Sequence, residues 1–126
     1  MELTLTRDSV HAADDVDAPH EVRPELAEDS DLGDLVDWIL RRHYLPLAGG
    51  GTWVLFLGAR RGGRAAAIPG RPAAVISSSK HEPPEVAFIL EAHSPVAGYW
   101  WADLAHGYRG GAQEVAQRWI WRQKTS

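Results

Sequence analysis

Alternating apolar and polar residues open the chain. Leu3 and Leu5 alternate with polar neighbours, which is the period of a half-buried strand, so we expect a first strand from residue 2 to about residue 10. An Asp-rich connection follows, and a short return strand near Val22 is limited by Pro24. The N-terminal segment is therefore predicted to form a loose β-hairpin.

Helical spacing begins after Ser30. Apolar side chains recur every three or four positions, and His43 continues their stripe, while acids occupy the first turn and arginines the last. These charges complement the helix dipole at both ends. Ser30 or Asp31 can cap the N-terminus, and Pro46 with the glycines that follow it stops the helix. The pattern predicts a helix over residues 31–43.

The second half of the chain is divided into short apolar runs. A continuous run at residues 52–57 is typical of a strand that is covered on both faces. Shorter runs predict strands at residues 65–68, 73–77 and 86–90. Apolar residues return to helical spacing in the tail, which favours a C-terminal helix over residues 112–122, although the letters RWIWR by themselves also fit a strand.

This order of elements resembles the β-grasp or ubiquitin-like arrangement over roughly the first 90 residues. The expected fold class is α+β, with a β-grasp-like mixed sheet, one central helix and a C-terminal helix. At 126 residues the chain has the size of one domain, which we expect to span residues 1–126. The runs LTLTRDSVHAADDVDAPHE, YLP and GGGTWVL also resemble small uncharacterised bacterial proteins, and that resemblance implies no activity.

Composition excludes several classes of function. The chain is 44% hydrophobic and 24% charged, which is ordinary for a folded domain. It contains no cysteine, so disulfides, thiolate catalysis and zinc–thiolate sites are excluded. No segment approaches the roughly 20 apolar residues of a membrane span, and the N-terminus has no secretory pattern. We therefore expect a soluble cytoplasmic protein.

Charge is divided unevenly along the chain. Residues 1–37 carry twelve Asp and Glu against two Arg, a net of −10, and residues 38–126 carry eleven Lys and Arg against five acids, a net of +6. The two parts either neutralise each other in the fold or leave an acidic face for a basic partner.

The densest acidic cluster consists of Asp14, Asp15, Asp17, His20 and Glu21. Closely spaced carboxylates can bind Mg²⁺ or Ca²⁺, but the calcium-loop pattern fails because Pro and His stand where an acid and Gly are needed. We expect no bound metal and no other cofactor. The run is interpreted as a solvated acidic turn or, in a functional role, as a docking patch made by its three aspartates.

An arginine- and glycine-rich loop follows the run at residues 52–57. Two of its glycines have the spacing of a phosphate-binding loop, but Arg64 takes the place of the lysine and Ala65 has no hydroxyl for Mg²⁺, so nucleotide hydrolysis is rejected. Arg60, Arg61 and Arg64 can still contact phosphates or an acidic protein surface. The pI of about 5.8 opposes general nucleic-acid binding, and a plain surface loop is the alternative.

Six histidines raise the hypothesis of acid–base or metal chemistry, but no two have a close ligand spacing. They are His11, His20, His43, His81, His93 and His106. His93 beside Ser94, and His106 near Asp103, could act as acid–base pairs. No nucleophile motif such as G-x-S-x-G accompanies them, so an enzyme is the alternative rather than the first choice.

The aromatic residues are the strongest indication of function. Trp53 heads the apolar strand and Trp119 lies on the apolar side of the last helix, so both are predicted to be core residues. The aromatic candidates for a binding surface are Trp38, Tyr99, Trp100, Trp101 and Trp121. Neighbours in a strand alternate between faces, so at least one of three consecutive aromatics must lie at the surface. Exposed tryptophan is enriched in protein interfaces.

These patterns favour a non-catalytic protein–protein interaction module, of accessory or immunity type, that docks through an acidic N-terminal face and C-terminal aromatics. Its partner is expected to be another protein; a membrane is not expected, nucleic acid is disfavoured, and an oligomer is compatible with the patterns. Two alternatives are kept. One is a small His/Asp-dependent hydrolase or metal-dependent enzyme, and the other is phosphate or single-stranded nucleic-acid binding by the Arg60–Arg71 loop with stacked tryptophans.

Overall fold

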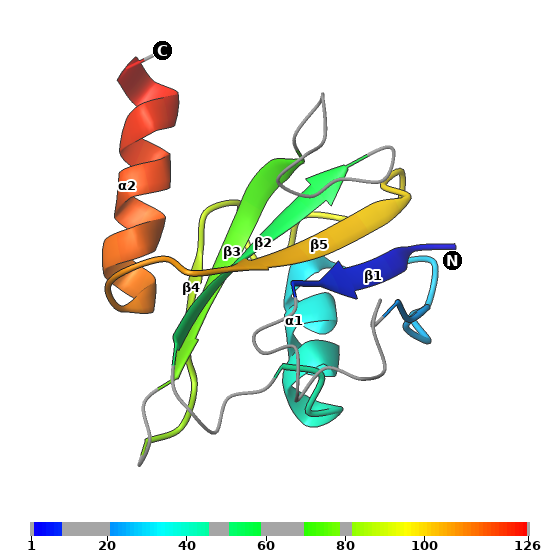
Figure 1. Cartoon of the computed structure of the whole chain (residues 1–126). Helices are drawn as coiled ribbons and strands as arrows, with labels where there is room; N and C mark the ends of the chain where they lie inside the picture. The colour runs from blue at the N-terminus through cyan, green and yellow to red at the C-terminus, as the bar shows by residue number, and fades with distance from the viewer. Residues whose placement is uncertain (1, 9–20, 46–50, 59–69, 79–81, 126) are drawn as a thin grey trace.

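The computed structural model describes residues 2–8, 21–45, 51–58, 70–78 and 82–125. In chain order the elements are β1 (Thr4–Arg7), α1 (Leu32–Arg41), β2 (Gly51–Gly58), β3 (Arg71–Ser78), β4 (Glu85–Phe88), β5 (Trp101–His106) and α2 (Ala112–Thr125). The described residues form a five-stranded mixed sheet in the order β1-β5-β2-β3-β4. Figure 1 shows α2 beside β3 and β4, with β1 at the opposite edge of the sheet.

The first and last strands are neighbours in this sheet. β1 pairs with β5 in parallel, whereas β5 with β2, β2 with β3 and β3 with β4 are antiparallel pairs. On the outer side of β1, Leu5 and Val22 exchange two backbone hydrogen bonds of 2.8 and 2.9 Å as an isolated antiparallel bridge. The predicted return strand is thus reduced to one bridge. The α+β class, with a mixed sheet, a central helix and a C-terminal helix, is confirmed.

A reciprocal cap begins α1. The Asp34 N–H donates to Asp31 Oδ1 at 2.9 Å, and the Asp31 N–H donates to Asp34 Oδ2 at 3.0 Å, so two otherwise unpaired helix donors are satisfied. The helix ends at Arg41, and His43 follows in the left-handed region with φ of 51°. His43 is exposed, so its predicted place on the apolar stripe is wrong. The helix ends two residues before it, and the left-handed backbone at His43 does not continue the helix.

Strand alternation divides the apolar side chains between two cores. On β2, Trp53, Leu55 and Leu57 join the buried side chains of α1 in the larger core. Val54 points to the other face, where it meets Val75 and the buried residues of α2. The continuous apolar run at residues 52–57 therefore follows from burial on both faces, as predicted.

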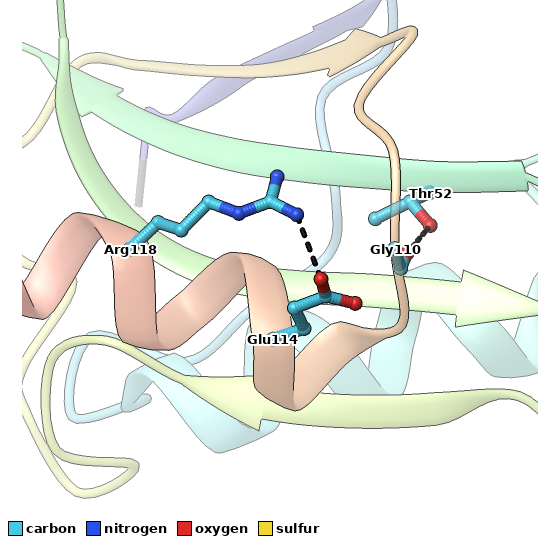
Figure 2. Close-up of polar contacts among 4 residues, drawn as sticks. All are labelled: Thr52, Gly110, Glu114 and Arg118. Carbon is cyan, nitrogen blue, oxygen red and sulfur yellow. Dashed lines mark hydrogen bonds and ion pairs between the residues drawn. The ribbon is translucent and has the colours of Figure 1, made fainter.

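Hydrogen bonds from two strands fix the start of α2. The Thr52 hydroxyl donates to the Gly110 carbonyl at 2.6 Å (Figure 2), and the Ala112 N–H donates to the Ser77 hydroxyl at 3.1 Å. An ion pair of 3.0 Å between Glu114 and Arg118 spans the first turns of the helix. The tail is a helix rather than a strand, and it continues three residues beyond the predicted end.

β5 was not among the predicted strands, although it lies between β1 and β2. Its sequence WADLAH contains two alanines and an aspartate, which have low strand propensity, and its length gives little period-2 signal. The predicted strand at residues 65–68 lies outside the described residues, as do residues 9–10 of the predicted first strand. In the part of the chain that the structure describes, no helix has the length and apolarity to cross a membrane.

Candidate functional site

An open hollow of about 230 Å³ lies where the N-terminal segment meets the turn before β5. Its described lining residues are Glu2, Glu28, Ala97, Gly98, Tyr99 and Trp100. We call this site the Glu2–Trp100 hollow. It joins two features that are far apart in the sequence, the acidic N-terminal part and the aromatic C-terminal part.

The backbone of Trp100 is held from two sides. Its N–H donates to the Gly58 carbonyl of β2 at 3.0 Å, and its carbonyl accepts from the Thr4 N–H of β1 at 2.9 Å. The turn before it is closed by a 3.2 Å bond from the Tyr99 N–H to the Val96 carbonyl, with Gly98 at φ of 96°. Such a φ favours glycine, because side chains on other residues are strained there. The aromatic pair is therefore presented by fixed backbone rather than by a loose loop.

Glu28 is placed by a turn that docks on the same segment. The Ser30 N–H donates to the Ala27 carbonyl at 3.0 Å, and the Ser30 carbonyl accepts from the Val96 N–H at 3.3 Å. Val96 is fully buried and anchors this contact in the main core. The acid and the aromatic pair thus belong to one packed unit.

Trp100 and the core residue Trp53 differ in their exposure to solvent. Trp100 is 57% exposed, whereas Trp53 is completely buried, and Tyr99 is half-buried. The carboxylates Glu2 and Glu28 are exposed as well. Aromatic ring faces carry negative electrostatic potential, so the rings and the carboxylates among the described lining residues are both groups that attract cations.

The other aromatic candidates lie away from this lining. Trp38 on α1 packs against the main core, with Tyr44 at 6.3 Å between ring centroids. Trp101 is half-buried in β5 opposite Gly58, and Trp121 on α2 is 69% exposed. Of the five aromatic candidates, only Tyr99 and Trp100 are therefore among the described lining residues of the hollow.

The charged residues that the sequence predicts as site candidates all lie outside the described residues. They are Asp14, Asp15, Asp17, Arg60, Arg61 and Arg64. Exposed carboxylates nevertheless occur in the described residues before and within α1, contributed by Glu21, Glu25, Glu28, Asp29, Asp34 and Asp37. Sequence reasoning identified an acidic N-terminal part but missed Glu2 and Glu28 as site residues, since only the fold brings two glutamates 26 positions apart to one hollow.

The predicted acid–base pairs have a different geometry from the one the sequence suggested. His106 and Asp103 are three residues apart in β5, so they project to opposite faces: His106 packs on Trp53 with 4.8 Å between ring centroids, and Asp103 accepts a 2.6 Å bond from the Thr6 hydroxyl. His93 pairs with Glu91 at 2.8 Å, and both side chains are exposed. Within the described ranges, no group of three His, Asp or Glu could hold a metal ion.

Burial perturbs one phenol near the edge of the sheet. The Tyr44 hydroxyl donates to the Leu5 carbonyl at 3.4 Å, and burial raises the pKa of this phenol well above its usual value near 10. The Arg7 guanidinium, 5.8 Å from the ring centroid, opposes the increase in pKa. The carboxylates of Asp103 and Glu21 add to it.

This shift predicts an alkaline loss of stability. The folded phenol holds its proton at pH values where the unfolded phenol has lost it, so the stabilisation is complete below about pH 10 and is lost as pH rises above that value. The slope is below about 1.4 kcal/mol per pH unit, because Tyr44 is only half-buried and solvent screens it. Urea unfolding at pH 9 and pH 11 should show a steeper decrease for the wild type than for Tyr44→Phe. Equal decreases in both proteins would contradict the prediction.

Comparisons with family models, with curated proteins and with solved structures find no match to this chain. A proposal for its function therefore depends on the chemistry of the described residues. Among those residues, the Glu2–Trp100 hollow combines an exposed anchored tryptophan, a second ring and two carboxylates in one place.

Proposed function

We propose that the chain is a non-catalytic protein–protein interaction module, of accessory or immunity type, that docks on another protein through Trp100 and the acidic surface beside it. The observation that carries this proposal is the 57% exposure of Trp100 on a backbone that is hydrogen-bonded to two strands. Large side chains on fixed backbone lose little conformational freedom on binding, which is why tryptophan dominates many binding hot spots.

The acidic surroundings support the same function. Glu2 and Glu28 lie at the hollow, and further exposed acids occur in residues 21–37, before and within α1. Charge of one sign beside an aromatic anchor attracts a partner of opposite charge and increases the association rate. A partner with a basic surface is therefore favoured over an acidic one.

The two alternatives receive less support. The carboxylates of Glu2 and Glu28 disfavour phosphate at the hollow, and the arginines that could hold nucleic acid lie outside the described residues. For a hydrolase, His106 and Asp103 point to opposite faces of β5, and His93 is engaged with Glu91.

Affinity measurements on tryptophan variants test this proposal. Tagged wild-type chain recovers its partner from cells that express it, and the purified partner is then titrated calorimetrically with the wild type, Trp100→Ala and Trp121→Ala. Loss of a hot-spot tryptophan costs roughly 2 kcal/mol or more, so Trp100→Ala should weaken binding about 30-fold or more. Trp121→Ala is the matched control, because it removes another tryptophan that is more than half exposed, from α2.

Thermal melting separates a binding effect from an unfolding effect. Both variants should melt within a few degrees of the wild type, because each side chain is more than half exposed. Equal affinity of Trp100→Ala and the wild type for the purified partner would refute the proposed function.

A further inference from the structure

We infer that the Glu2–Trp100 hollow receives one arginine side chain of the partner protein. The inference rests on the proposed function and adds the chemistry of the group that is recognised. It predicts that the partner presents an exposed arginine, and that arginine is bound in preference to lysine.

The size of the hollow indicates one side chain. Its volume of about 230 Å³ is below the roughly 300–1,000 Å³ of pockets that enclose small-molecule ligands. The hollow is open to solvent and lies at the surface, so an occupant can enter while its own backbone stays outside. A side chain that projects from a partner protein meets both conditions.

The charge of the lining selects a cation. The six described lining residues include two carboxylates, two aromatic rings and no Lys, Arg or His. A cation gains from both kinds of group, because it pairs with a carboxylate and is attracted to a ring face. An anionic or neutral occupant would gain neither interaction.

The shape of the groups favours arginine over lysine. A guanidinium is planar and stacks on an aromatic face while its edge donates two parallel hydrogen bonds to a carboxylate. The ring of Trp100 and the carboxylates of Glu2 and Glu28 come from three separate segments that meet at the hollow. An ammonium is a compact, strongly hydrated charge that uses the ring face less fully.

The placement of these groups is largely set before binding. Trp100 is held by hydrogen bonds to β1 and β2, and the turn of Glu28 is held through Ser30 against the buried Val96. The backbone that carries Trp100 and Glu28 is therefore already in place when a cation binds, so only side-chain freedom is lost at these two residues.

A titration of the free protein tests the inference without the partner. Acetyl-arginine-amide, acetyl-lysine-amide and the uncharged isostere acetyl-citrulline-amide are added to ¹⁵N-labelled protein, and the Trp100 indole signal, assigned with Trp100→Phe, is followed by NMR. We expect saturable binding of the arginine probe with Kd on the order of 1 mM, as suits a single side chain. The lysine probe should bind at least threefold more weakly, and the citrulline probe should give no saturable shift.

Paired charge variants separate the site from the overall field. Glu2→Gln with Glu28→Gln should weaken the arginine probe at least tenfold, while Glu25→Gln with Glu85→Gln, which removes the same charge from exposed positions outside the lining, should change Kd less than twofold. Equal binding of the arginine and lysine probes, or equal effects of the two double variants, would overturn the inference.

The two proposals fail in distinguishable ways. If Trp100→Ala loses the protein partner but the arginine probe does not bind, the interaction module stands and the arginine site is refuted. If the arginine probe binds as expected but Trp100→Ala keeps full affinity for the purified partner, the cation site stands by itself and its role in docking is refuted.

Discussion

Replacing Trp53 by alanine should lower the free energy of unfolding by about 3–5 kcal/mol, the usual cost of removing a buried tryptophan. The side chain is completely buried in the main core, and its ring lies 4.8 Å from that of His106 between centroids. It belongs to β2, which has a strand on each side, so the cavity cannot collapse by moving an edge strand. Small domains are stable by only about 5–15 kcal/mol, so this loss is a large part of the total.

Urea unfolding followed by far-UV circular dichroism measures this effect, with an expected decrease of about 2 M in the midpoint. Trp53→Phe should lose much less, because the indole N–H of Trp53 is buried with no hydrogen-bond acceptor among the described residues, and phenylalanine removes that polar group. Trp100→Ala serves as the exposed control and should lose no more than about 1 kcal/mol. A Trp53→Ala variant as stable as the wild type would contradict the burial of this side chain.

Trp119→Ala should have the second largest effect, a loss of about 2–3 kcal/mol, which is less than for full burial because the side chain is half-buried. Its ring lies 5.7 Å from Phe56 and 6.4 Å from Tyr108 between centroids, and the Arg122 guanidinium lies 5.1 Å from its centroid. The buried residues of α2 are small, namely Ala112, Val115 and Ala116. Trp119 is therefore the largest side chain with which the helix packs in this cluster.

The part of the structure that is destabilised distinguishes this variant from Trp53→Ala. Hydrogen exchange of the α2 amides should accelerate in Trp119→Ala more than exchange in β2, because the helix loses its main contact while the larger core is intact. Trp121→Ala, two positions along the same helix and 69% exposed, should leave both stability and exchange near wild type. Equal losses in the two helix variants would show that Trp119 does not anchor α2.

The two hydrophobic cores stabilise different parts of the molecule. Trp53 and the α1 face hold the sheet, and the segments that form the Glu2–Trp100 hollow are anchored in that core through Val96. Trp119 and α2 cover the other face, away from the hollow. Substitutions in the second core should therefore change stability more than partner binding.

Several elements could be read from local sequence. The acids and arginines at the ends of α1 and the stripe of apolar residues between them specify a helix wherever it packs, and the helix was predicted to within two residues at its end. The apolar run of β2 likewise required burial on both faces. The burial of Trp53 was predicted from its place in this apolar run, and the exposure predicted for at least one of the three consecutive aromatics is found at Trp100, in the turn before β5.

The hollow and β5 could not be predicted from local sequence. Three of the six residues of β5 have low strand propensity, and it is a strand because β1 and β2 offer hydrogen bonds on both of its sides. Glu2, Glu28 and Trp100 lie in three segments separated by up to 98 positions, and no spacing rule relates them.

The sequence by itself determined the elements with strong local patterns, the absence of thiol chemistry and the uneven division of charge, because these depend on neighbouring residues or on composition. Only the tertiary structure decided which aromatic is presented to solvent beside which acids. The physical reason is that strand pairing joins the chain's first residues to its last strand, so an acidic beginning and an aromatic end meet at one surface.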